Sequence, residues 1–250
     1  MRRTILALAA ALLALTTLVG CSSGGSDTLR VGTEGTYSPF SFQGPDGQLT
    51  GYDVEVARAV GAKLGKEVEF VQTPWDSIFA ALESKRIDLV ANQVTVNDER
   101  KARYDLSTPY TVSEGVIVTR ADDTTIRSLA DLRGRTTAQS ATSNWAEVAR
   151  GAGANVEAVE GFVQAVQLVK DGRVDATVND NLAVGEYEKS TGDKGVKVAG
   201  TTGDTSEQAF AARKDSGLMP DVDRALAELR ADGTLKQLSE KYFGSDVSGK

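Results

Sequence analysis

Histidine is absent from the 250 residues of this chain, and cysteine occurs once, as Cys21. Histidine is the commonest general base, nucleophile partner and transition-metal ligand, so its absence excludes histidine-dependent hydrolases. A single cysteine excludes a disulfide within the chain and a cysteine cluster that binds zinc. No apolar run is long enough to span a membrane as a helix. We therefore expect no metal site, no cofactor and no catalytic residues.

The N-terminus has the parts of an export signal. Arg2 and Arg3 form a basic start, residues 5–19 form a short apolar run, and Leu18-Val19-Gly20-Cys21 follows with small residues before the cysteine. That tetrad resembles the bacterial lipoprotein box, in which the signal is cleaved before an acylated cysteine. The resemblance implies a signal peptide at 1–20, lipidation of Cys21 and a flexible tether at 21–27. The alternative is a cleaved signal that ends near a cysteine by chance.

The charge balance is acidic. The formal net charge is −7, and it becomes −9 when cleavage of the signal peptide removes Arg2 and Arg3. An acidic body without a basic run argues against binding to nucleic acid.

The rest of the chain alternates β-rich runs with amphipathic helical ones, which predicts α/β architecture with mainly parallel sheets. In the first part we expect strands at 29–33, 68–72 and 87–91, a hairpin tip at 44–47, and helices at 51–64 and 75–82. In the second part we expect strands at 116–119, 136–139, 156–159 and 174–178, with helices at 128–132, 143–150, 162–169 and 182–187. A strand at 208–212 and helices at 222–230 and 235–242 complete the pattern.

Polar residues follow the apolar strand predicted at 87–91. Asn92, Gln93 and Thr95 come at its C-terminal end, where open α/β sheets bind ligands. Asn97 then suits a helix N-cap, and Arg100 lies in the first turn of that helix. Amides, a hydroxyl and a guanidinium fork that converge in this way suit a carboxylate. The alternative is an ordinary strand-loop-helix corner whose Arg100 pairs with a surface acid.

At this point the sequence resembles a known family. The stretch 51–60, beginning Gly-Tyr-Asp-Val-Glu-Val, is similar to the signature of the solute-binding proteins for polar amino acids that serve ABC importers, and 231–244 is similar to their usual ending. Residues 34–42, 85–88 and 92–110 are most like the L-cystine binders. The resemblance implies the two-lobed periplasmic-binding-protein type II fold, with 28–113 plus 207–250 in lobe 1 and 114–206 in lobe 2.

The resemblance also implies contacts for the ligand's amino-acid end. Arg100 would bind the α-carboxylate with help from Thr95 and the backbone around Gln93. Thr142 and Ser143 would reach the same carboxylate from the second lobe, although Thr142 also suits an ordinary N-cap. Asp180 would accept from the α-ammonium group; the alternative is a solvated loop acid. Ala141 stands where the family usually has glycine.

Other implied contacts concern the ligand's side chain. Tyr37 and Trp75 would sandwich it between aromatic rings, but Trp75 also fits the apolar stripe of its own helix. Glu34 would face the second amino group of cystine or the cation of lysine or arginine. Asn92 and Gln93 are neutral and suit a ligand with a second polar end.

These features together predict a monomeric, lipid-anchored amino-acid receptor on the outer face of the cytoplasmic membrane, working with an ABC permease and its ATPase. We expect L-cystine first, a basic amino acid second, and glutamine or another polar amino acid third. Two other classes remain open. One is an enzyme, because a few relatives on this fold are dehydratases, and the other is a sensor that docks on a signalling partner.

Overall fold

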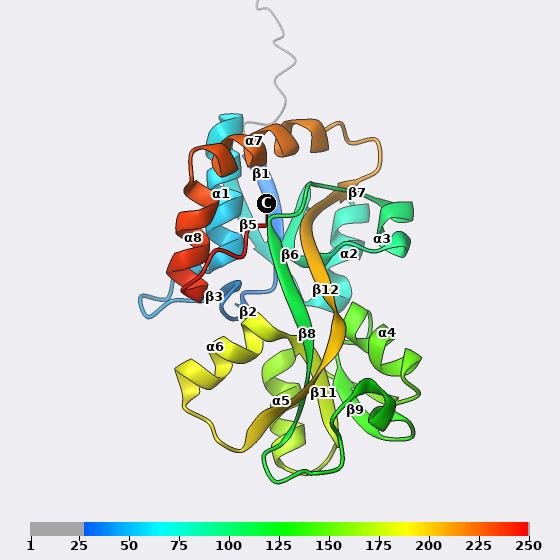
Figure 1. Ribbon diagram of the computed structural model, residues 1–250. Helices are drawn as coiled ribbons and strands as arrows, with labels where there is room; N and C mark the ends of the chain where they lie inside the picture. Colours follow the sequence, from blue (N-terminus) through cyan, green and yellow to red (C-terminus); the bar gives the residue numbers. More distant parts are fainter. Residues whose placement is uncertain (1–27, 250) are drawn as a thin grey trace, which may run out of the picture.

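The computed structural model describes residues 28–249, so the predicted signal peptide, Cys21 and the tether lie outside the described residues. The described chain forms two α/β lobes, one above the other in Figure 1. They are joined by two long strands, β8 (Thr111–Arg120) and β12 (Val196–Arg213). The predicted fold class is confirmed. The predicted lobe bounds fall inside these two strands and stay a prediction.

Lobe 1 combines segments from both ends of the described chain. α1, α7 and α8 lie on one side of its sheet, and α2 and α3 lie on the other (Figure 1). Its elements are β1 (Thr28–Thr33), β2 (Thr36–Tyr37), β3 (Ser41–Gln43), β4 (Leu49–Thr50), α1 (Tyr52–Leu64), β5 (Glu67–Gln72), α2 (Trp75–Glu83), β6 (Leu89–Thr95), α3 (Asp98–Arg103), β7 (Tyr104–Leu106), α7 (Met219–Ala231) and α8 (Thr234–Phe243).

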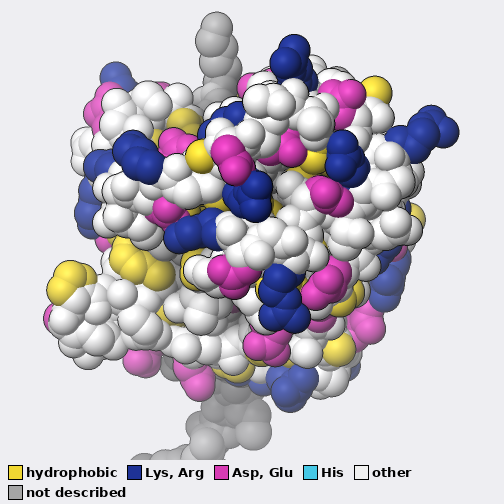
Figure 2. Space-filling view, turned by 90° about the horizontal axis from the view of Figure 1, so that it is seen from below, with side chains coloured by type: hydrophobic (Ala, Val, Ile, Leu, Met, Phe, Trp, Pro, Cys, Tyr) yellow, Lys and Arg dark blue, Asp and Glu magenta, His cyan; other side chains and the backbone are white. Residues whose placement is uncertain are grey.

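Lobe 2 follows the alternation that the sequence predicts. It contains the 3-10 helix η1 (Leu129–Leu132), β9 (Thr136–Gln139), α4 (Asn144–Gly151), β10 (Asn155–Ala158), α5 (Phe162–Lys170), β11 (Ala176–Asp180) and α6 (Asn181–Thr191). On the face of this lobe that is turned away from lobe 1, acidic and basic side chains are intermixed, with small apolar patches (Figure 2).

One sheet runs through both lobes, in the order β10-β9-β11-β8-β12-β6-β1-β5, with β7 also paired to β12. The β1–β5, β1–β6, β9–β10 and β9–β11 pairs are parallel, as predicted. β12 pairs antiparallel with β8 and then with β6. The predicted strand at 208–212 is therefore only the end of an 18-residue strand.

Alternation along β6 separates the core of lobe 1 into two layers. Leu89 and Ala91 face the α1, α7 and α8 side, whereas Val90 and Val94 face α2. Successive strand residues point to opposite faces, so this strand can bury apolar side chains on both. Among residues 28–249, no helix is long and apolar enough to cross a membrane.

β6 differs from the strand that the sequence predicts at 87–91. It begins at Leu89 and extends to Thr95, so Asn92, Gln93 and Thr95 belong to the strand instead of following it. Its pairing with β12 shifts register between Val90 and Val94, and Gln93 has a positive φ of 49°. This irregularity re-aims the side chains of the strand end.

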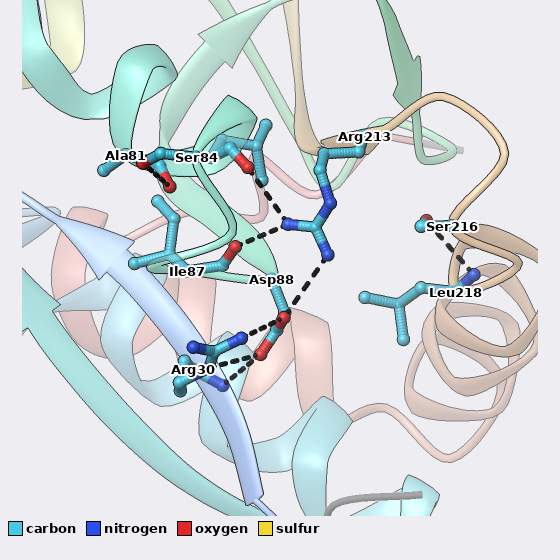
Figure 3. Close-up of polar contacts among 9 residues, drawn as sticks. Arg30, Ala81, Ser84, Ile87, Asp88, Arg213, Ser216 and Leu218 are labelled. Carbon is cyan, nitrogen blue, oxygen red and sulfur yellow. Dashed lines mark hydrogen bonds and ion pairs between the residues drawn. The ribbon is translucent and has the colours of Figure 1, made fainter.

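A charged corner fixes the start of β6 to its neighbours (Figure 3). Arg30 Nε and Nη2 donate to the two carboxylate oxygens of Asp88 at 2.9 and 2.8 Å. Arg213, at the end of β12, donates to the Ile87 carbonyl at 2.7 Å and to Asp88 at 3.4 Å. The corner therefore joins β1, the β6 entry and β12 at the edge of lobe 1 away from lobe 2.

Candidate ligand-binding cleft

A cleft lies between the lobes and takes its walls from both. Its empty volume is about 560 Å³, including the space at its mouth, which lies in the range of small-molecule sites. Six predicted site residues line it: Glu34, Tyr37, Trp75, Asn92, Gln93 and Ser143. The other lining residues are Thr36, Gln139, Ser140, Asn144, Trp145, Gly161, Phe162, Ala165, Thr177 and Asn179.

Three of the lining residues carry buried polar atoms that have no hydrogen-bond partner among the described residues. They are Trp75 Nε1, Gln93 Oε1 and Gln139 Nε2. A buried donor or acceptor without a partner costs about 1–3 kcal/mol, so such atoms call for an explanation. A polar ligand in this cleft would supply partners for these two donors and one acceptor.

Glu34 gives the cleft its charge. Among the lining residues that the structure describes, it is the one ionisable carboxylate, and no cationic side chain is present. Its Oε2 accepts from Asn92 Nδ2 at 2.6 Å, and Asn92 Oδ1 accepts from the Glu34 amide at 2.8 Å. Burial raises the pKa of Glu34. The cleft therefore suits a ligand that brings a positive group to Glu34.

Gln93 is held by Asp53, which lies in the first turn of α1. Asp53 is fully buried, and its two oxygens accept from Gln93 N at 2.7 Å and Gln93 Nε2 at 2.6 Å. These bonds fix Gln93 in the left-handed conformation that a non-glycine residue otherwise avoids. Burial raises the pKa of Asp53 to about 7.

Arg100 lies beside the cleft and does not line it. Its guanidinium carbon sits 5.1 Å from the Trp75 ring centroid and 5.8 Å from that of Phe79, and Nη1 donates to the Thr95 carbonyl at 2.9 Å. Burial lowers its pKa to about 10, so it stays charged at neutral pH. The predicted N-cap is confirmed, because Asn97 Oδ1 accepts from the Arg100 amide at 2.8 Å.

Arg100 and Thr142 line a second cavity that adjoins the cleft, together with Asp76 and Glu147. Thr142 is not the N-cap of α4; that position belongs to Ser143, whose Oγ accepts from the Ala146 amide at 3.1 Å. Thr142 instead bonds to Asp76 of lobe 1. The predicted carboxylate-binding residues of the two lobes are thus brought near each other, while Ser143 faces the main cleft.

Asp180 is buried at the end of β11 and lines neither cavity. It accepts a short hydrogen bond from Ser113 and a bond of 2.9 Å from the Leu182 amide, so it is also the N-cap of α6. Burial raises its pKa to about 6. The alternative that Asp180 is a solvated loop acid is therefore wrong. Its carboxylate faces Ser113 and the start of α6 instead of the open cleft.

Several lining residues were missed by sequence reasoning. Asn179, one residue before Asp180, lines the cleft and accepts from Tyr37 Oη at 2.7 Å. Trp145 and Phe162 lie at the starts of α4 and α5. Each is an aromatic residue that follows the end of a predicted strand, and this position could have indicated a contact with the ligand. Gln139 is the last residue of β9, and Asn92 and Gln93 likewise lie in the C-terminal half of β6.

The lobes touch across the cleft, through the Tyr37–Asn179 bond and through Asp76 with Thr142. Among residues 28–249, no group of three or more histidine, cysteine, aspartate or glutamate side chains is placed to hold a metal ion.

Comparison with known proteins agrees with this arrangement. The chain is 52% identical over 222 residues to the L-cystine-binding protein TcyA of Bacillus subtilis strain 168, covering 88% of this chain and 82% of TcyA. An ancestral arginine-binding protein bound to arginine matches with a TM-score of 0.81 at 39% identity, over 87% of this chain and 99% of that one.

A third comparison concerns the arrangement of the two lobes. The L-cystine solute receptor of Neisseria gonorrhoeae, in its unliganded open conformation, is 46% identical over 89% of this chain and 95% of its own, yet its TM-score is 0.60. The arginine-bound protein is less similar in sequence but more similar in shape. Hinging of two lobes lowers the TM-score between open and closed forms, so the lobes of this chain are arranged more like those of the arginine-bound protein than like those of the open receptor.

The match to a family description covers residues 29–245, nearly all of the described chain. Together with the relatives above, it shows that the chain belongs to the bacterial extracellular solute-binding proteins, family 3.

Proposed function

We propose that this chain is the receptor of an amino-acid ABC importer, that it captures L-cystine between its lobes, and that it delivers the ligand to the permease. Its similarity to TcyA supports the ligand. The observation that carries the proposal is the closed cleft with buried donors and an acceptor that lack partners among the described residues.

L-Cystine fits the chemistry of this cleft. It has two zwitterionic ends joined by an apolar disulfide, so it needs polar partners at both ends and apolar contact between them. Trp75 Nε1 and Gln139 Nε2 are free to donate, and Gln93 Oε1 is free to accept. The rings of Tyr37, Trp75 and Trp145 supply flat contact area that loses little conformational entropy.

In this proposal Arg100 and Thr95, with Thr142 and Ser143 opposite, bind one α-carboxylate, and Asp180 lies at the ammonium side. Arg100 already lies against the Trp75 ring, so a change of side-chain rotamer brings its fork toward the cleft. A charge-assisted bond of this type contributes roughly 1.5–3 kcal/mol. Glu34, with Asn92 holding it, receives the second ammonium group.

A basic amino acid is the second candidate ligand, and Glu34 is the observation that favours it. A single carboxylate in an otherwise neutral cleft suits the cation of arginine or lysine as well as the second ammonium of cystine. Glutamine lacks such a group and is the third candidate.

The same proposal places the receptor outside the cytoplasm, anchored by lipid on Cys21 and tethered through residues 22–27. Incorporation of labelled fatty acid into the full chain, and its loss in Cys21→Ser, tests the anchor. In this proposal the chain acts as a receptor and not as an enzyme or sensor. Recovery of the amino acids unchanged after long incubation with the protein is the result expected if it is not an enzyme.

Calorimetry on protein without residues 1–21 tests the ligand, with L-cystine, L-cysteine, L-arginine and L-glutamine compared. We expect the tightest binding for L-cystine, and a loss of binding in Arg100→Ala. Preferred binding of arginine would replace cystine by a basic amino acid, and no heat with any amino acid would overturn the receptor assignment.

A further inference from the structure

Asp76, in the first turn of α2, crosses from lobe 1 to the loop before α4 of lobe 2. Its Oδ1 accepts from the Thr142 amide at 2.9 Å and from Thr142 Oγ1 at 2.7 Å, and its Oδ2 accepts from the Ala141 amide at 3.2 Å. Three donors from one loop therefore surround one carboxylate. The contact is exposed at the rim, so it can form and break without disturbing either core.

The donors that Asp76 uses are of the kind that a ligand carboxylate needs. Two backbone N–H groups and a hydroxyl that converge on two oxygens recognise any carboxylate, whether it belongs to a side chain or to a free amino acid. Asp76 and Thr142 line the same cavity as Arg100. Within residues 28–249 the Arg100 guanidinium makes one hydrogen bond, to the Thr95 carbonyl, so most of its fork is unused.

We propose that Asp76 is an internal stand-in for the ligand's carboxylate: it seats on the Ala141–Thr142 donors in the ligand-free protein and holds the lobes closed. This rests on the proposed function, because it assigns regulation to the same site. When an amino acid enters, its carboxylate replaces Asp76 on the loop and engages Arg100. Asp76 therefore competes with the ligand and lowers the apparent affinity.

The competition has a definite sign. When part of a protein is held in a form that must open first, the apparent dissociation constant equals the intrinsic one divided by the fraction that is open. Releasing Asp76 should therefore make the ligand-free protein more open and ligand binding tighter, by about twofold to tenfold. A latch that also persisted in the ligand-bound form would act in the opposite direction and weaken binding when removed.

Distance measurements by double electron–electron resonance test the ligand-free state. Protein without residues 1–21 has no cysteine, so Lys101→Cys and Glu157→Cys place one spin label on the exposed surface of each lobe. We expect Asp76→Asn to shift the ligand-free distances to longer values. Glu83→Gln removes one negative charge from the same cavity, and the partners of Glu83, Arg103 and Tyr104, both belong to lobe 1, so this variant should leave the distances unchanged. Identical distances in Asp76→Asn and the parent would overturn the proposal.

Calorimetry on the unlabelled variants tests the competition. We expect L-cystine to bind Asp76→Asn about twofold to tenfold more tightly than the parent, and Glu83→Gln to bind like the parent. Unchanged or weaker binding in Asp76→Asn overturns the stand-in. Because the distances are measured without ligand, they judge the Asp76 contact even if cystine proves not to be the ligand. Thr142→Ala, which removes one donor, should shift the distances in the same direction and less far.

Discussion

Replacing Glu34 by glutamine removes the negative charge from the cleft while the side chain keeps its shape. The substituted amide retains an oxygen that can accept from Asn92 Nδ2, the bond that is 2.6 Å long in the parent. Any large change in ligand binding is therefore caused by the charge. Glu34 is half-buried, so its interaction with a cation is screened less than that of a surface pair.

The expected loss follows from a hydrogen bond to a charged group, which contributes about 1.5–3 kcal/mol. Since about 1.4 kcal/mol is tenfold in affinity, Glu34→Gln should weaken L-cystine and L-arginine binding by roughly 10- to 150-fold. L-Glutamine brings no second cation, so its affinity should change by less than about threefold. Calorimetry with the three ligands measures this difference.

The variant should also be at least as stable as the parent without ligand. Burial raises the pKa of Glu34, which means that the folded protein disfavours its charged form at neutral pH. Glu157→Gln is the matched control, because Glu157 is exposed on β10 of lobe 2. Equal losses for cystine and glutamine, or no loss for cystine, would refute the placement of Glu34 against a second cation.

Three further predictions concern the scaffold of the site. Burial raises the pKa of Asp53 to about 7, so its contribution to stability is complete below its ordinary pKa of 3.8 and is lost as pH rises through 7. Urea unfolding should show a fall in the free energy of unfolding on the order of a few kcal/mol between about pH 4 and 7, and this fall should flatten in Asp53→Asn. Gly115→Ala would place a Cβ against the Trp145 ring and 2.7 Å from the Thr202 side chain, so it should cost about 1–3 kcal/mol and change tryptophan fluorescence. Asp88→Ala leaves Arg30 and Arg213 without their shared partner, and should lower stability in urea by about 1–2 kcal/mol at unchanged ligand affinity, because the corner is far from the cleft.

Local signals in the sequence predicted most helices and strands. The first-turn acids and Gly65 bound α1, and Asn97 caps α3, because caps and glycine turns depend on residues close in the chain. The length of β12 was not predictable in this way. Its first two thirds, from Val196 to Glu207, are rich in glycine, threonine and charge, and this part forms a strand because β8 pairs with it. Such pairing joins residues that are far apart in the sequence, and no local propensity records it.

The sequence could predict a site residue only where the order of helices and strands determines which residues lie beside it. Glu34, Asn92 and Gln93 reach the cleft because β1 and β6 are adjacent parallel strands, and that follows from the alternation of elements. The role of Asp53 could not be predicted, because it depends on a contact between α1 and β6 that joins Asp53 to Gln93, 40 residues further along the chain. The contact of Asp76 with Thr142 could not be predicted either, because it forms only when the two lobes lie against each other. The contacts of Asp53 and Asp76 therefore depend on the tertiary arrangement alone.

Three buried or half-buried acids lie around the cleft, and they differ in what their carboxylates bind. Asp53 uses its carboxylate to hold Gln93 and fixes the wall of lobe 1, and Asp180 is bonded to Ser113 and to the start of α6 in lobe 2. Glu34 is bonded to a neutral amide, so its charge remains available to a ligand. A buried charge without a counter-charge is unfavourable, and the ligand-free protein carries that penalty at Glu34. Under the proposed function, closure on a cation relieves this penalty, which would link the choice of ligand to the closed state offered to the permease.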